Sequence, residues 1–241
     1  MTTSSFIGEK DMPKVKEGYY QEKKDKILDI ALQICNHKPA YDVKMSDIIS
    51  ESGLSQGGVY KYFSDIDEVF SALINRANAQ KNYIEQIDMI VERKDAPETI
   101  LLNLFSFSEL YFSDMLISYN KILFELGTFF AHDHERRDKI SKNVESITVF
   151  EYLTQKMYAL LSEQTELGYF TPILPLKDVV AFICAAFDGI IRDVTLTKCY
   201  LPAAEKPTLI AFDEKQLIKS LYISTLTLLG KQCPIQEGDK I

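Results

Sequence analysis

A short segment of the sequence carries polar side chains on one face of a predicted helix. Residues 56–62 read QGGVYKY, and Val59 and Phe63 stand at the i, i+4 spacing that turns both toward a protein interior. The outward face is then left with Gln56, Gly57, Gly58, Lys61 and Tyr62. A short helix that is buried on one side and polar on the other is what the major groove of DNA accepts. The chemistry predicted for this segment is therefore the recognition of duplex DNA.

The residues before this helix predict how it is positioned. Residues 46–52 fit a first short helix, and Gly53 can take the left-handed conformation that ends a helix abruptly. Ser55 is expected to accept a hydrogen bond from the free N–H groups at the start of the second helix. Residues 45–63 thus predict a helix-turn-helix.

Two adjacent glycines break the usual preference inside a helix. Gly57 and Gly58 each cost roughly 1 kcal/mol relative to alanine. A bare Cα would let the backbone approach DNA closely, but it would also permit tight packing against the neighbouring helix. We expect one glycine to serve each purpose.

The rest of the chain is also helical in its periodicity, with glycine and proline placed at boundaries. Helices are predicted near 21–36, 46–52, 56–62, 66–91, 97–111, 114–131, 135–167, 175–199 and 213–229. Start signals are Ser55, Asp65 with Glu68, and Pro97, and stop signals are Gly53, Gly168 and Gly230. The predicted fold class is all-α, about nine helices. A three-helix domain over 19–65 would precede a larger helical domain over 66–230.

The charge is distributed unevenly along the 241 residues. The whole chain has a formal net charge of −8. Residues 10–63 contain nine Lys, no Arg and eight Asp or Glu, a net of +1, so the remainder carries −8 − 1 = −9. A basic first quarter is compatible with DNA binding, because phosphate contacts are local.

Four scattered cysteines bear on the cellular compartment. Cys35, Cys184, Cys199 and Cys233 form no CxxC pair, which indicates reduced thiols rather than a disulfide framework or a zinc site. No signal peptide and no membrane span is expected from the apolar runs. We therefore expect a cytoplasmic protein that has no cofactor and does not interact with membranes.

The segments around the helix-turn-helix resemble a known family. They read KDKILDIA at 24–31, DII at 47–49, GLSQGGVY at 53–60 and YF at 62–63. This spaced pattern resembles the N-terminal domain of the TetR/AcrR family of bacterial transcriptional regulators. The residues from Glu166 to Pro172, followed by those from Val179 to Gly189, resemble the family's approach to its dimerisation helices.

The resemblance implies a ligand-responsive regulator, most often a repressor, that binds a palindromic operator as a homodimer. The residues expected at DNA are Ser46, Ser55, Gln56, Gly57, Gly58, Tyr60, Lys61 and Tyr62. The tyrosine hydroxyls would bind mainly phosphates, whereas the amide of Gln56 can pair with adenine and is the best candidate for reading a base. Ile66 stands where the family usually has a lysine, and Ile49 where a small residue is common.

The larger domain is then expected to bind a ligand and a second copy of the chain. An unknown small apolar or amphipathic ligand is expected near a minority of the aromatic residues, namely Phe105, Tyr111, Phe112, Tyr119, Phe124, Tyr152 and Phe187. An apolar stripe predicts dimerisation through Val180, Ile183, Cys184, Phe187, Ile191, Leu221 and Leu228. The long helix predicted over 66–91 would connect the two domains.

Other interpretations of the sequence have less support. No GxSxG, Walker-type loop, GxGxxG or Glu-x-x-His pair is present, so an enzyme is not expected. His132 and His134 could suggest a metal site, but helix capping by Asp133 explains this segment more simply. A salt bridge or exposure likewise explains Glu109, Glu125 and Asp188 better than a cationic ligand does. The alternative function is a helical protein-binding adaptor that uses residues 176–230, which would leave the polar face of 56–62 without a purpose.

Overall fold

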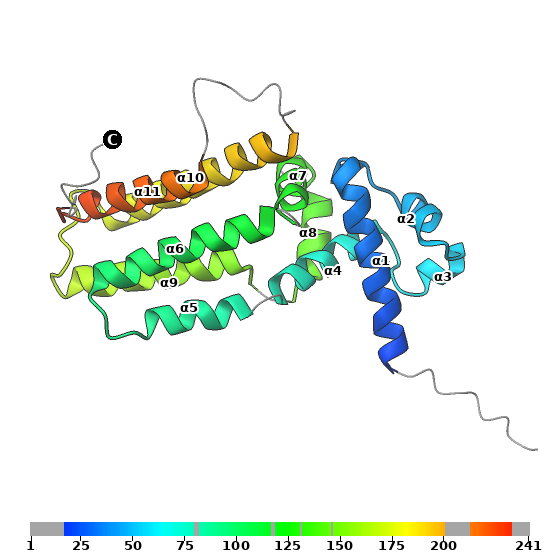
Figure 1. Cartoon of the computed structure of the whole chain (residues 1–241), viewed down its shortest axis with the longest axis horizontal. Helices are drawn as coiled ribbons and strands as arrows, with labels where there is room; N and C mark the ends of the chain where they lie inside the picture. The colour runs from blue at the N-terminus through cyan, green and yellow to red at the C-terminus, as the bar shows by residue number, and fades with distance from the viewer. Residues whose placement is uncertain are drawn as a thin grey trace, which may run out of the picture.

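The protein is all-helical in the computed structural model, which describes residues 17–79, 82–116, 119–130, 132–145, 147–200 and 213–232. These ranges contain eleven α-helices and no strand, so the predicted fold class is confirmed with two more helices than expected. Figure 1 shows a small group of helices at one end of the molecule and a longer bundle beside it.

The small group, which we call the head, consists of residues 17–65. Its elements are α1 (Glu17–His37), a 3-10 turn η1 (Ala40–Asp42), α2 (Met45–Ser52) and α3 (Gln56–Tyr60). The face of α1 that packs against the rest of the protein carries Ile27, Ala31 and Cys35, all buried. This is the i, i+4, i+8 spacing of one helix face, so a single stripe of α1 holds the head together.

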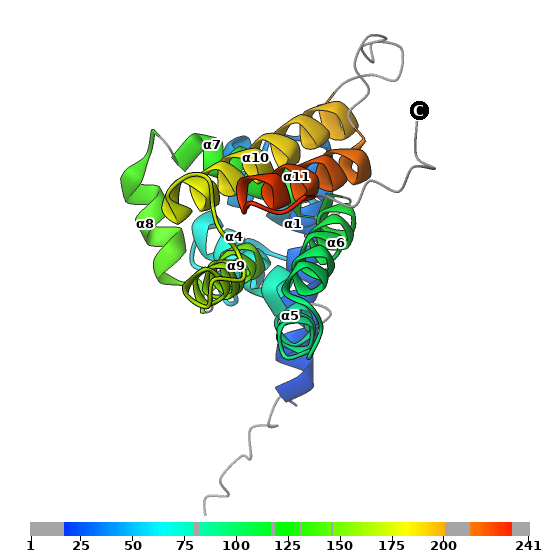
Figure 2. The ribbon, with the colours of Figure 1, turned by 90° about the vertical axis from the view of Figure 1, so that its left-hand side faces the viewer.

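The bundle, which we call the body, begins at residue 66. Its helices are α4 (Ile66–Ala79), α5 (Tyr83–Val91), α6 (Pro97–Leu116), α7 (Asn120–Phe130), α8 (His134–Lys142), α9 (Val149–Glu166), α10 (Leu176–Thr195) and α11 (Glu214–Leu228). A π-helical turn, Leu196–Tyr200, continues α10. Seen along the bundle, α10 and α11 lie side by side over α6 and α9 (Figure 2).

The helix predicted over 66–91 is wrong, because the chain forms two helices there. Asn82 has a left-handed backbone conformation with φ 47°, which an α-helix cannot include. Residues 66–79 and 83–91 therefore form two separate helices, α4 and α5. No continuous rod connects the head to the far end of the body.

The single helix predicted over 135–167 is also wrong. The break between α8 and α9 is set by Thr148, whose hydroxyl accepts a hydrogen bond from the N–H of Glu151, while the Glu151 carboxylate accepts one from the N–H of Thr148. This capping box is a sequence signal for a helix start that the periodicity had concealed. The break between α6 and α7 also lies later than predicted, since α6 continues to Leu116.

The predicted start and stop signals are confirmed. The glycines Gly53, Gly168 and Gly230 all have left-handed φ angles, of 65°, 74° and 76°. At Gly230 a Cβ atom would also lie 2.4 Å from the carbonyl oxygen of Thr171, so glycine is required there for space as well. Pro97 opens α6, and Asp133 caps α8 by accepting a hydrogen bond from the N–H of Arg136 at 3.0 Å.

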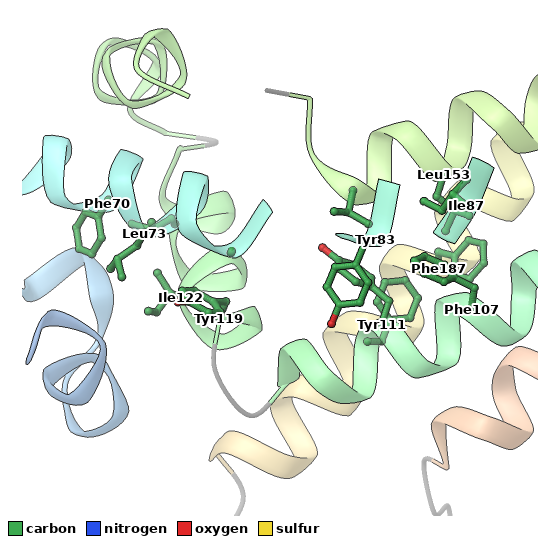
Figure 3. Packing of buried hydrophobic residues seen from close by; sticks show 14 of the residues in the cluster. Phe70, Leu73, Tyr83, Ile87, Phe107, Tyr111, Tyr119, Ile122, Leu153 and Phe187 are labelled. Carbon is green, nitrogen blue, oxygen red and sulfur yellow. The ribbon is translucent and has the colours of Figure 1, made fainter. Parts of the chain in front are cut away.

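The hydrophobic core runs from the head through the body. Figure 3 shows Phe70 and Leu73 of α4 close to Ile122 of α7 and to Tyr119, which directly precedes α7, and a second group around Phe187 deeper in the body. The core thus continues from the part of the body next to the head into the bundle.

Cys233, one of the four cysteines expected to be reduced, lies outside the described residues. Among the described helices none is both long enough and apolar enough to span a bilayer.

Candidate DNA-binding surface

The turn between α2 and α3 follows from three residues in sequence. Gly53 ends α2, and the hydroxyl of Ser55 accepts a hydrogen bond from the N–H of Gly58 at 3.1 Å, which caps α3. Val59 and Phe63 are both fully buried and hold the inner side of the segment. The two helices are thereby fixed at an angle by their own local chemistry, as expected of a helix-turn-helix.

Helix α2 is also fixed to the end of α1 by an ion pair. The Nζ of Lys38 lies 2.6 Å from a carboxylate oxygen of Asp47, which accepts a second hydrogen bond from the N–H of Lys44 at 2.8 Å. The hydrogen bond from Lys38 is the largest influence on this carboxyl and holds the pKa of Asp47 below its usual value. The start of α2 is therefore anchored where it would approach DNA.

Most of the residues predicted at DNA lie on the surface of the head. Ser46 on α2 is exposed, and so are Ser55, Gln56, Gly57, Tyr60 and Lys61 along α3 and its ends. Gly58 is half-buried. These residues come from two adjacent elements, so the structure gathers them into one exposed surface.

Tyr62 does not face outward as the sequence predicted. Helix α3 ends at Tyr60, and Tyr62 lies in the turn at residues 61–62 that follows it. Tyr62 is only 9% exposed, and the centroid of its ring lies 4.8 Å from that of Tyr20 on α1. Tyr62 is therefore mainly a packing residue between α1 and the end of α3.

The two glycines of α3 have different surroundings. A Cβ atom on Gly57 would meet nothing within 4 Å, whereas one on Gly58 would lie 3.2 Å from the Oγ of Ser55. Packing within the protein thus explains Gly58 but not Gly57.

Both departures from the family pattern are buried in part. Ile49 and Ile66 pack against the hydrophobic core of the protein. An apolar side chain at position 66 thus contributes to packing at the start of α4.

The seven candidate ligand residues do not share one location. Four of them, Phe105, Tyr111, Phe112 and Phe187, are buried in one aromatic cluster with neighbouring ring centroids 5.4–5.7 Å apart. The other three lie elsewhere. The hydroxyl of Tyr119 accepts a hydrogen bond from Arg76 of α4, and that of Tyr152 donates one to Asp88 of α5. Phe124 is half-buried on α7.

The cluster around Phe187 leaves little free space. A cavity beside it, lined in part by Met157, Ile183 and Cys184, has a volume of about 10 Å³. That is no more than a single water molecule requires. A ligand larger than this would have to displace side chains between α9 and α10.

The predicted dimerisation stripe is divided between the core and the surface. Ile183, Phe187 and Leu221 are at most 5% exposed and pack inside the body, so assigning them to a partner interface was wrong. Val180, Cys184, Ile191 and Leu228 are half-buried. Helix α10 has a buried apolar face and a partly exposed apolar face, and the sequence prediction treated the two as one stripe.

The outer face of α10 is where the sequence missed residues. Ala181, Phe182, Ala185 and Asp188 are exposed there, and the ring of Phe182 is 46% exposed. Their i, i+1, i+4, i+7 spacing is the signal that would have separated this face from the buried one.

The comparisons with known proteins agree with this geometry. Residues 27–73 match the model of the family described as bacterial regulatory proteins, tetR family. The HTH-type transcriptional regulator YfiR of Bacillus subtilis is 26% identical over 181 residues, which cover 75% of this chain and 84% of YfiR.

Solved structures of regulators share the fold. The regulator MbdR from Azoarcus sp. CIB matches with a TM-score of 0.61 at 18% identity, covering 86% of this chain and 98% of that one. The fatty acid degradation regulator FadR from Bacillus halodurans matches with a TM-score of 0.57 at 20% identity, covering 86% and 94%.

A helix-turn-helix head with an exposed second helix, attached to an all-helical body, defines a DNA-binding transcriptional regulator rather than an enzyme. Over residues 27–73 the chain has the N-terminal domain described for the tetR family of bacterial regulatory proteins.

Proposed function

We propose that this protein is a ligand-responsive repressor that binds a palindromic operator as a homodimer. Residues 19–65 would form the DNA-binding domain, and residues 66–230 the ligand-binding and dimerisation domain. The observation that carries the proposal is the exposed surface of Ser46, Gln56, Tyr60 and Lys61 on two helices fixed by caps and an ion pair. No feature of the chain favours the adaptor function over this one.

Each residue of this surface has a distinct expected role. Gln56, at the first position of α3, would read a base edge in the major groove, where the amide can pair with adenine. Lys61 and the hydroxyl of Tyr60 would bind phosphates, which fix the register without reading sequence. Because its ring is packed on Tyr20, Tyr62 would contribute to DNA binding only through its hydroxyl.

The proposed dimer uses the outer face of α10. Ala181 and Ala185 would allow two helices to approach closely, and Phe182 would bury its exposed ring against the second copy. A two-fold pair of α10 and α11 would place two heads on successive major grooves, which accounts for the palindrome.

The proposed ligand is apolar or amphipathic and binds within the body. The buried aromatic cluster of Phe105, Phe112 and Phe187 provides a lining of this character once side chains move. Such a ligand would favour the conformation that does not bind DNA and so release the operator.

The test of DNA recognition is selection of binding sites from random duplexes with the full-length protein. We expect an inverted repeat to be enriched and to bind roughly 10³-fold or more tightly than a scrambled duplex. Affinity should fall as the salt concentration rises, because counterions are released from the phosphates. Failure to enrich any sequence would contradict the proposed function.

The ligand requires a separate experiment. Lipophilic compounds are screened for an increase in melting temperature, and the hits are added to the preformed operator complex. Hits that stabilise the protein should also release the operator. Compounds that stabilise the protein without changing DNA affinity would contradict ligand control.

A further inference from the structure

A buried carboxylate joins the head to the body. Glu125 lies on α7 and is 6% exposed. Its Oε2 accepts a hydrogen bond from the backbone N–H of Ala40 at 2.6 Å, and Ala40 is the first residue of η1 in the head. Its Oε1 lies 3.0 Å from the Nζ of Lys121 and accepts a hydrogen bond from the hydroxyl of Tyr200.

Lys121 makes a second contact with the head. Its Nζ donates a hydrogen bond to the carbonyl oxygen of Cys35 at 2.6 Å, in the last turns of α1. The same Nζ lies 5.5 Å from the centroid of the Tyr200 ring. We call Glu125, Lys121 and Tyr200, with these two backbone groups, the Glu125 junction.

The buried carboxylate of Glu125 is both paired with a cation and hydrogen-bonded. A carboxylate removed from water is costly unless it is paired and hydrogen-bonded, and this one has a cation and two further donors. The same observation removes a cationic ligand from consideration, because Lys121 already occupies that role. Glu125 is therefore a structural group whose partners lie on three elements.

The location of the partners gives the junction its mechanical role. The head is covalently continuous with α4, and the ion pair of Arg76 with Asp29, at 2.7 Å, also binds the head to α4. Contacts with α4 alone would leave the head free to turn about that helix. The Glu125 junction attaches the head to a different helix, α7, and so removes this freedom.

The third partner connects the junction to the far side of the body. Tyr200 ends the π-helical turn that continues α10, the helix that we propose for dimerisation. A displacement of the end of α10 that carries Tyr200 away from α7 would break the hydrogen bond between the Tyr200 hydroxyl and Glu125. The hold on the head thus depends on the position of α10.

We propose that Glu125 is a positioning residue that holds each head in the orientation that binds the operator, and that Tyr200 makes this hold depend on the end of α10. This inference rests on the proposed DNA-binding function. Glu125 and Tyr200 would affect the orientation of the head, and neither is among the residues proposed to touch DNA.

The test uses three variants of the full-length protein and two readouts. Glu125→Gln keeps the size of the side chain but removes its charge, Lys121→Met removes the cation, and Tyr200→Phe removes only one hydroxyl. The first readout is hydrogen exchange of the Ala40 amide, which reports the junction directly. The second is affinity for the selected operator.

We expect Glu125→Gln to speed exchange at Ala40 at least tenfold and to weaken operator binding about tenfold. Lys121→Met should behave similarly, and Tyr200→Phe should have a smaller effect of the same sign on both readouts. The heads would then bind from a wider range of orientations, which costs affinity at both half-sites.

The control variant is Leu153→Ala, which removes a fully buried side chain of α9 away from the head. It should lower the melting temperature at least as much as Glu125→Gln while leaving Ala40 exchange and operator affinity near wild type. This separates positioning of the head from a general loss of stability.

Unchanged exchange at Ala40 in Glu125→Gln would overturn the proposal, because the contact would then not hold the head. Faster exchange with unchanged or tighter operator binding would overturn it too, because the held orientation would not be the one that binds DNA. If the wild-type protein bound no operator, the proposed function would fail, whereas the exchange readout would still report on the junction.

Discussion

The head and the body differ in how strictly local residues determine their structure. In the head, Gly53 and Ser55 each impose one conformation, and the turn between α2 and α3 has the predicted form. In the body, apolar residues occur on several faces of the same helix, and two of the long helices predicted from periodicity, over 66–91 and 135–167, are each divided. The structure of the DNA-binding surface thus follows from residues close together in the sequence, whereas the structure of the body depends on how whole helices pack.

The largest effect should separate the two apolar faces of α10. Phe187→Asp places a charge in the aromatic core and should cost roughly 3–5 kcal/mol or more, giving little folded protein. Phe182→Asp changes an exposed ring and should leave each subunit folded but monomeric. Urea denaturation and analytical ultracentrifugation measure the two outcomes.

Phe182→Asp provides the decisive comparison, because Phe182 is 46% exposed on a single subunit and a partner chain could bury it. A stable dimer of this variant would show that the outer face of α10 is not the interface.

A smaller effect should distinguish two residues of the head. Gln56→Ala should cost roughly 1–3 kcal/mol on the cognate operator and relax base preference at one position in each half-site. Lys61→Ala should weaken binding to all duplexes alike and reduce its salt dependence. Affinities for the operator and for a panel of single-base variants test this division. Equal losses on every duplex for both variants would contradict it.

Alanine substitutions at the two glycines of α3 should separate protein stability from DNA affinity. Gly57→Ala has open space for its methyl group and should stabilise the head by up to about 1 kcal/mol. We expect it nevertheless to weaken operator binding, since the methyl group would face DNA. Gly58→Ala would crowd the Ser55 cap and should be less stable than Gly57→Ala. Thermal denaturation and operator affinity of the two variants are compared, and undiminished binding by Gly57→Ala would show that no close approach occurs there.

The smallest effect concerns the ion pair between α1 and α2. The hydrogen bond from Lys38 lowers the pKa of Asp47 in the folded head. A lowered pKa gives stability that is present above the unfolded value of about 3.9 and is lost as the pH falls through the folded value. Because the pair is partly exposed, at most about 1 kcal/mol is expected.

Asp47→Asn should therefore be less stable than the wild type at neutral pH and lose less stability on acidification. Denaturation curves at pH values from about 6 to 3 test this. Parallel loss in both proteins would show that Asp47 does not contribute.

Part of the candidate site could be predicted from the sequence, and part could not. The exposure of Gln56, Tyr60 and Lys61 follows from the helical phase set by Val59 and Phe63. The burial of Tyr62 does not, because it depends on where α3 ends and on Tyr20, a residue 42 positions earlier in the chain. In α10 the sequence prediction merged the buried and exposed faces, although the spacing of Phe182, Ala185 and Asp188 could have separated them.

The sequence by itself determined the all-α class, the helix-turn-helix and its caps, because glycine conformations and side-chain caps act within a few residues. Only the tertiary structure decided which face of α10 is buried, how the aromatic residues are distributed, and that Glu125 meets Ala40 and Tyr200. Glu125 is separated from these partners by 85 and 75 residues. Such contacts depend on the packing of whole helices, which residue types and spacings along one segment do not specify.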